Sequence, residues 1–119
     1  MKLSTININN EGFRFMQPSI EKIKTLCLKY KVNKLYAFGS VCRDDFNTNS
    51  DVDFIVNFTE VPIYDYADYF FNLKEELEKV LSRKVDLITE KSLENPYFIN
   101  VVNKTKTLIY ERGSNQMPQ

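Results

Sequence analysis

The sequence of 119 residues contains no histidine. This absence excludes catalytic triads and dyads that depend on histidine, HExxH zinc sites and histidine general bases. If the chain is an enzyme, its chemistry must therefore be carried out by carboxylates, lysines, hydroxyl groups or a metal ion held by carboxylates.

Net charge, long apolar runs and a signal peptide are also missing. The 16 basic residues balance the 16 acidic ones, so no overall positive field attracts nucleic acid, and direct nucleic-acid binding is not expected. No apolar run reaches the length of a membrane span, and residues 1–10 lack the apolar core of a signal peptide. We therefore expect a cytoplasmic protein in which Cys27 and Cys42 are reduced thiols, Cys42 serving as a small packing residue.

The composition that remains is that of an ordinary globular domain, with 43% hydrophobic and 27% charged residues. The length argues for one domain, which is large enough to fold without disulfides. The sequence shows no repeat and no linker between domains. We assign residues 1–112 to a single domain and expect residues 113–119 to form a disordered tail.

The hydrophobic pattern predicts helices that alternate with short buried strands. Residues 1–17 show weak alternation and are predicted to form an edge strand or a loosely packed arm. The other predicted elements are helices over 18–30, 64–82 and 92–104 and strands over 35–38, 52–58, 85–88 and 107–110. This order favours an α/β (α+β) fold, a small mixed β-sheet flanked by helices, with one antiparallel pair formed by the strands near 38 and 52.

Two acidic residues, Asp51 and Asp53, stand at the start of the strand over 52–58. Residues two apart in a strand point to the same face, about 6.5 Å apart from the strand rise. Two like charges at that distance repel unless a cation neutralises them, and Mg²⁺ prefers such hard oxygen ligands. The same pair is also common where an aspartate simply caps a turn.

A third acid, Asp86, interrupts the apolar run over 85–88. An ionised carboxylate within a buried strand needs a partner or a metal ion. If this strand lies beside the one that begins at Asp51, three carboxylates converge, and three acids can hold two Mg²⁺ ions about 3.5–4 Å apart. Alternatively, Asp86 forms an ion pair with Arg83 or Lys84.

A glycine–serine turn, Gly39-Ser40, follows the predicted strand over 35–38. Glycine lets the backbone approach a ligand closely, and Ser40 would lie near a helix N-terminus, where free N–H groups attract phosphate. Arg43 adds a fixed positive charge for a triphosphate. An ordinary strand-to-helix turn explains the same pair, and the dinucleotide and Walker phosphate motifs are both absent.

Together these residues lie in the segment FGSVCRDDFNTNSDVDFIV, residues 38–56, in which ten residues separate Gly39-Ser40 from Asp51. The segment resembles the signature of the DNA polymerase beta-like nucleotidyltransferase superfamily. It is most similar to the minimal nucleotidyltransferases that form the antitoxin half of two-gene toxin–antitoxin modules. The resemblance extends over about residues 19–111 and includes Asp86 as the third acid.

The resemblance implies a role for each of these residues. Gly39 and Ser40 would contact the triphosphate of ATP, and Asp51 and Asp53 would bind two Mg²⁺ ions. Asp86 would bind the catalytic ion and help to deprotonate the attacking hydroxyl. One residue departs from the family pattern, because Asp44 stands where these proteins usually have glycine, and this extra carboxylate puts the efficiency of nucleotide binding in question.

The resemblance also implies a partner, since the chain is too short to supply a full acceptor site. In the related modules the antitoxin transfers AMP to a tyrosine of a HEPN-type toxin, so a protein adenylyltransferase is the first hypothesis. The second is a module that neutralises its partner by binding alone, and a nucleotidyltransferase for a small molecule is a third. The aromatic residues that favour a binding face are Phe13, Phe15, Tyr64, Tyr66, Tyr69 and Phe71, for which packing in the core is the alternative.

Overall fold

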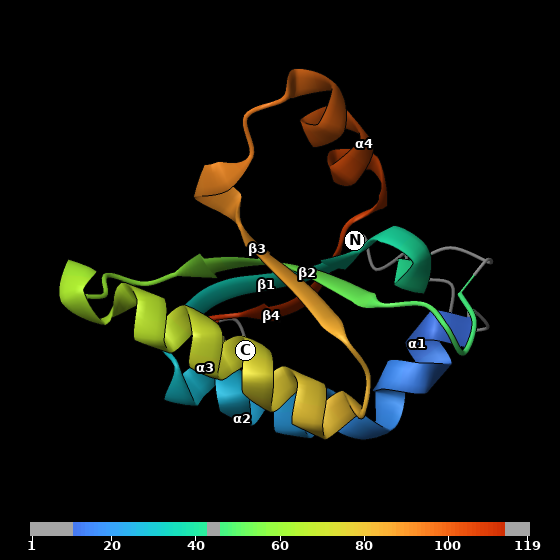
Figure 1. Cartoon of the computed structure of the whole chain (residues 1–119), viewed down its shortest axis with the longest axis horizontal. Helices are drawn as coiled ribbons and strands as arrows, with labels where there is room; N and C mark the ends of the chain where they lie inside the picture. The colour runs from blue at the N-terminus through green and yellow to red at the C-terminus, as the bar shows by residue number, and fades with distance from the viewer. Residues whose placement is uncertain (1–10, 43–45, 114–119) are drawn as a thin grey trace.

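The computed structural model describes residues 11–42 and 46–113 as four strands and four α-helices (Figure 1). The strands form one mixed sheet in the order β3-β2-β1-β4. β1 is antiparallel to both β2 and β4, whereas β2 and β3 run parallel. The elements are α1 (Glu11–Met16), α2 (Ile20–Lys29), β1 (Val32–Phe38), β2 (Val52–Phe58), α3 (Ile63–Leu81), β3 (Val85–Thr89), α4 (Pro96–Thr105) and β4 (Thr107–Glu111).

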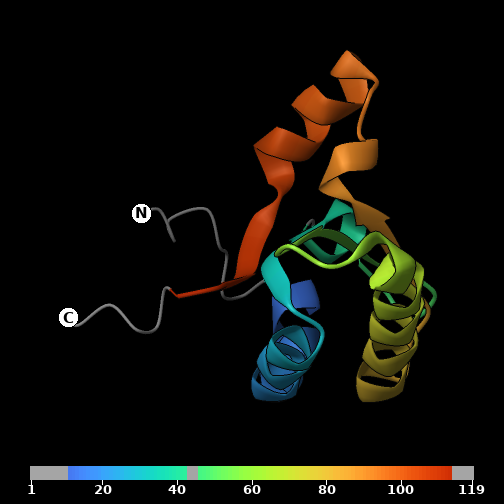
Figure 2. The same cartoon turned by 90° about the vertical axis from the view of Figure 1, so that its left-hand side faces the viewer.

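The two faces of the sheet are covered very differently. Figure 2 shows α2 and α3 side by side on one face, with α4 extending from the other. The face toward α2 and α3 holds the main core, in which Val52, Phe54 and Val56 of β2 are fully buried against Leu73 and Leu77 of α3. The opposite face holds only a small cluster of buried residues, formed by Phe38, Ile55 and Val102 of α4.

The alternation of side-chain direction along β2 explains why one face of the sheet is apolar and the other carries a charged residue. Val52, Phe54 and Val56 point into the main core, so Asp53 and Ile55 must point to the thinly covered face. A charged side chain at position 53 is therefore compatible with the fold only because α4 leaves part of that face uncovered.

The prediction of a strand or loose arm at the N-terminus is wrong for residues 11–16, which form α1. Phe13 and Phe15 suggested a period of two, but both are only half-buried. The buried residues of this segment are Gly12 and Met16, which lie four apart as helix geometry requires. The spacing was hidden because one of the two inward positions is a glycine, which carries no hydrophobic signal.

The other predicted elements are confirmed, with boundaries that differ by a few residues. The antiparallel pairing of the strands near 38 and 52 is also confirmed. The proposed tail falls mostly outside the described residues, as do residues 1–10. Among the described helices, none combines the length and the apolar character that crossing a bilayer would require.

Candidate functional site

Asp53 and Asp86 are direct neighbours across the parallel strands β2 and β3. The register pairs Val52 with Val85 and Asp53 with Asp86. Residues paired in this way point to the same face, and neighbouring strands lie about 4.8 Å apart. Two carboxylates separated by 33 positions in the sequence are thus brought side by side on the thinly covered face of the sheet.

Gly39 closes one side of this acidic pair. It has a φ of +76°, which L side chains rarely adopt, and it follows Phe38, the partner of Asp53 on β1. A Cβ atom at this position would collide with the Asp53 Oδ2 atom and lie 3.3 Å from its Cγ atom. The backbone conformation therefore favours glycine at residue 39, and any larger residue there would displace the half-buried Asp53 carboxylate.

Ser40 follows in a four-residue 3₁₀ turn, Gly39–Cys42, and is half-buried. This turn is shorter than the helix that would provide a macrodipole, so Ser40 offers its hydroxyl group and local backbone N–H groups rather than a helix end. Arg43, the cation predicted to meet the triphosphate, lies outside the described residues, as do Asp44 and Asp45.

α1 packs against the Gly39–Cys42 turn. Gly12 is buried there, and a Cβ atom at residue 12 would collide with the carbonyl oxygen of Val41. The side chain of Val41 is itself buried in the main core. Gly12 therefore allows α1 to pack against the backbone of the Gly39–Cys42 turn, a supporting contact that the sequence pattern did not reveal.

Asp51 lies just before β2 and is exposed, as is Asp86, whereas Asp53 is half-buried. Within residues 11–42 and 46–113, no three acidic or cysteine side chains are gathered closely enough to hold a metal ion. The backbone thus places Asp53 and Asp86 together and Asp51 two residues away, without closing the three carboxylates into a cluster.

The alternative role of Asp86, an ion pair with Arg83 or Lys84, is not seen among the described contacts. The Nη1 atom of Arg83 instead donates to the carbonyl oxygen of Ser50 at 2.7 Å and to that of Asn47 at 3.2 Å. The contacts of Arg83 therefore lead to the loop before Asp51.

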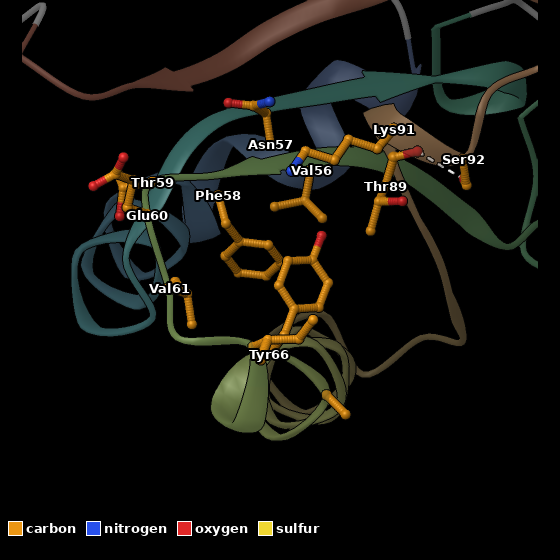
Figure 3. Close-up of a pocket in the computed structure, with 12 residues that line it drawn as sticks. Val56, Asn57, Phe58, Thr59, Glu60, Val61, Tyr66, Thr89, Lys91 and Ser92 are labelled. Carbon is orange, nitrogen blue, oxygen red and sulfur yellow. Dashed lines mark hydrogen bonds between the residues drawn. The ribbon is translucent and has the colours of Figure 1, made fainter.

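A separate cavity of about 800 Å³ lies between β2, α3 and the segment after β3 (Figure 3). Apolar side chains such as Phe58 and Tyr66 line it together with Thr89 and Lys91. Of the predicted site residues that the structure describes, none borders this cavity. It lies toward the carboxyl ends of β2 and β3, whereas Asp53 and Asp86 lie near their amino ends, so it is not the site of the acidic residues.

The aromatic residues considered as a binding face separate into two groups. Phe15 packs against the main core, Tyr66 packs edge-on against Phe58, and Tyr69 packs edge-on against Tyr30. By contrast, 94% of Tyr64 and 63% of Phe71 are exposed on α3. Packing within the protein therefore accounts for three of these side chains, Phe13 is half-buried in α1, and Tyr64 and Phe71 remain exposed for a partner.

Comparisons with known proteins agree with this geometry. Two curated archaeal proteins are similar in sequence. "Putative protein adenylyltransferase MJ1379" from Methanocaldococcus jannaschii is 46% identical over 62% of this chain and 73% of its own length. "Protein adenylyltransferase MntA" from Thermococcus cleftensis is 36% identical over 60% of this chain and 70% of its own.

A solved structure of an MNT antitoxin in complex with tri-AMPylated Shewanella oneidensis HEPN toxin has the same fold, with a TM-score of 0.57. Its sequence is 19% identical to this one, and the match covers 85% of this chain and 76% of that chain. The model of the family described as "Polymerase beta, Nucleotidyltransferase" matches residues 21–115, which include every predicted site residue. The chain therefore belongs to the polymerase beta nucleotidyltransferase family.

Proposed function

We propose that this chain is a Mg²⁺-dependent protein adenylyltransferase that transfers AMP from ATP to a tyrosine hydroxyl of a HEPN-type partner protein, acting as its antitoxin. The observation that carries the proposal is the pairing of Asp53 with Asp86 across two parallel strands, with Gly39 against the Asp53 carboxylate. The names of the two archaeal relatives and the AMPylated toxin in the related complex support the same reaction.

The acidic residues fit a site for divalent cations. Asp51, Asp53 and Asp86 offer only carboxylate oxygens, the donor type that Mg²⁺ prefers, and no competing imidazole exists in the sequence. We assign two Mg²⁺ ions to these three side chains. When bound, the ions would neutralise charge on the phosphates and favour the deprotonated form of the attacking hydroxyl.

The reaction forms one bond and breaks another at the α-phosphorus of ATP. The acceptor oxygen bonds to phosphorus, the bond to the bridging oxygen of the β-phosphate breaks, and pyrophosphate leaves. Asp86 accepts the hydroxyl proton, because its exposed carboxylate lies on the open face where an acceptor can approach. Asp53 lies between Gly39 and β3, so its position is the most restricted of the three carboxylates.

Gly39, Ser40 and Arg43 are assigned to the triphosphate. The absence of a side chain at Gly39 allows a phosphate to approach the backbone next to Asp53, and Ser40 adds a hydroxyl donor. Arg43 would neutralise the departing pyrophosphate. In this reaction the protein contributes mainly position and charge, which is characteristic of transfer at phosphorus.

We assign the acceptor hydroxyl to a partner protein. α4, which extends from the thinly covered face, carries exposed apolar side chains, since 78% of Tyr97 and 41% of Val101 are exposed, and these can form part of the contact. The same exposed residues, with Tyr64 and Phe71, favour a second candidate function: an antitoxin that neutralises its partner by binding alone.

One experiment separates the two functions. The partner is incubated with α-labelled ATP and Mg²⁺ together with the wild-type chain, Asp53→Asn or Glu21→Gln. Glu21 is an exposed carboxylate on α2, away from the site and from the exposed aromatic residues of α3, and serves as the matched control. We expect label on the partner with the wild type and Glu21→Gln and at least 100-fold less with Asp53→Asn.

Labelling that persists in Asp53→Asn would refute the proposed activity. If the wild-type chain and Asp53→Asn neutralise the partner equally well without labelling it, binding alone is the function.

We further propose a cytoplasmic location, in agreement with the state of the cysteines. Cys27 and Cys42 are both free thiols. Cys42 donates weakly to the carbonyl oxygen of Ala37, within 3.5 Å, as expected for a small packing residue.

A further inference from the structure

Arg83 occupies a position between α3 and β3 from which it reaches back to a distant loop. The chain leaves α3 through Ser82, which has a left-handed φ of 52°, and Arg83 follows directly. Its Nη1 atom donates to the carbonyl oxygen of Ser50 at 2.7 Å, 33 positions earlier in the sequence. This short bond to a main-chain acceptor fixes the residue immediately before Asp51.

The guanidinium group is also held by two aromatic rings. It lies 4.5 Å from the ring centroid of Phe15 and 5.1 Å from that of Phe46, and the two rings are themselves 5.5 Å apart. Arginine combines a planar face that stacks on rings with several N–H donors in fixed directions, which lysine lacks. The site is therefore specific for arginine rather than for a positive charge.

The loop that Arg83 contacts is already closed on itself. Ser50 N donates to the carbonyl oxygen of Asn47 at 3.0 Å, Asn47 N donates to Ser50 Oγ at 3.0 Å, and Asn49 N donates to Asn47 Oδ1 at 2.8 Å. Arg83 Nη1 also reaches the Asn47 carbonyl oxygen at 3.2 Å. One side chain therefore joins both ends of this turn to the segment that leads into β3.

Asp51 is fixed on both sides by the same short segment. On one side Arg83 binds the Ser50 carbonyl oxygen, and on the other Val52 N donates to the carbonyl oxygen of Lys84 at 3.0 Å. Asp86 lies only two residues beyond Lys84 on β3. The segment formed by Arg83 and Lys84 thus sets where Asp51 stands relative to Asp86.

We infer that Arg83 is a positioning residue for the divalent-cation site, which it serves by fixing the backbone of Asp51 without touching a ligand. The inference rests on the proposed function, because it assumes that Asp51 binds a metal ion. Residues that orient metal ligands typically change metal affinity by about 10–100-fold when replaced.

The test measures Mn²⁺ binding by electron paramagnetic resonance, using Mn²⁺ alone and the full-length chain. The variants are Arg83→Lys, Asp53→Asn and the matched control Arg112→Lys. Arg112 is exposed after β4, and its described bond, from its backbone N to the carbonyl oxygen of Asn33, is kept by lysine. Each measurement is made well below the melting temperature of that variant, so that every sample is folded.

We expect Arg83→Lys to weaken Mn²⁺ affinity by about 10-fold and Arg112→Lys to leave it unchanged. In the transfer assay, Arg83→Lys should raise the Mn²⁺ concentration needed for half-maximal rate while saturating Mn²⁺ restores most of kcat. A loss of packing alone would lower the melting temperature without this split. Amide hydrogen exchange at Ser50 and Val52 should also become faster in Arg83→Lys than in Arg112→Lys.

Two outcomes overturn the inference, and they are distinguishable. If Asp53→Asn loses Mn²⁺ but Arg83→Lys binds it as the wild type does, the site exists and Arg83 does not position it. If the wild type and Asp53→Asn bind Mn²⁺ equally, the proposed site itself is wrong, and the role of Arg83 fails with it.

Discussion

Replacement of Gly39 by alanine tests whether the approach of the Gly39 backbone to Asp53 matters for function. The change adds one methyl group at a position with a φ of +76°, next to the Asp53 carboxylate. Two other glycines allow the effect of the left-handed backbone conformation to be measured apart from the effect of a collision with the added Cβ atom. Gly113 has a φ of +86° and no atom within 4 Å of an added Cβ, whereas an added Cβ at Gly12 would meet backbone atoms of Val41.

The expected costs follow from these environments. A left-handed conformation costs alanine about 1–2 kcal/mol, from which about 0.4–1 kcal/mol is recovered because alanine restricts the unfolded chain. We therefore expect Gly113→Ala and Gly39→Ala each to lower the free energy of unfolding by about 1 kcal/mol. The Asp53 carboxylate can turn away from the new methyl group, so the collision adds little to the loss of stability at Gly39.

The effect on activity should be much larger at Gly39. Turning the Asp53 carboxylate displaces the side chain that we propose as a metal ligand by about 1 Å, and misplacement on that scale lowers rates by about 100-fold. Gly113→Ala should leave the rate of AMP transfer unchanged. Gly12→Ala should lower stability by about 1–3 kcal/mol, because the backbone of Val41 cannot turn away as a side chain does.

Urea unfolding of the three variants and initial rates of label transfer at saturating Mg²⁺ measure both quantities. The reasoning predicts that Gly39→Ala and Gly113→Ala are similar in stability and differ in rate. A folded Gly39→Ala variant with the rate of the wild type would refute the role assigned to this contact.

Three further predictions concern stability and reactivity. The Glu78 carboxylate accepts from Val85 N at 3.0 Å and from Lys74 Nζ at 3.3 Å, and these bonds, first that from Val85, lower the pKa of Glu78. Glu78→Gln should therefore lower the free energy of unfolding, measured in urea at pH 7, by about 1 kcal/mol. Because the pKa of Glu78 is lower in the folded chain than in the unfolded chain, this stabilisation is complete above about pH 4.5 and is lost as the pH falls through the folded pKa. The difference in stability from the wild type should therefore shrink below about pH 4.5. Burial raises the pKa of the Cys27 thiol to about 12. Iodoacetamide at pH 8 should therefore modify Cys27 only when urea unfolds the protein, which peptide mass mapping would show. Labelling of Cys27 in the folded protein would contradict its burial. Asn95 Oδ1 accepts hydrogen bonds from Tyr97 N and Phe98 N at the start of α4. Asn95→Ala should therefore lower the free energy of unfolding by about 1 kcal/mol. An unchanged urea midpoint would show that this helix cap does not stabilise the fold.

Most of the fold could be predicted because its signals are local. The apolar stripe of α3 and the alternation in β2 each depend on neighbouring residues, and both elements were predicted with small errors at their ends. The acids at positions 51, 53 and 86 were recognisable for a related reason, because charged residues beside apolar strand residues contradict the pattern around them. The sequence alone did not decide whether the two acid-bearing strands are neighbours, and the parallel register now supplies that fact.

The supporting contacts were beyond the reach of sequence patterns. Gly12 allows α1 to pack closely because it has no side chain, and Arg83 binds the carbonyl oxygen of Ser50, which lies 33 positions earlier in the sequence. Neither residue disturbs a local periodicity, so nothing in the sequence distinguishes it from a surface residue. Such contacts depend on how elements pack, which propensity and periodicity do not determine.

The contacts that lock β2 against β3 lie at the same end of the sheet as the acids. A slip of one residue in this register would turn Asp86 to the buried face, so the register decides whether the site exists. Glu78 holds Val85 N, Lys84 holds Val52 N, and Arg83 holds the loop before Asp51. The far ends of the two strands border the cavity of Figure 3, where Phe58 and Tyr66 form its wall. None of these contacts involves a residue that borders the cavity, so a substitution at the carboxyl ends of the two strands is expected to leave the pairing of Asp53 with Asp86 intact.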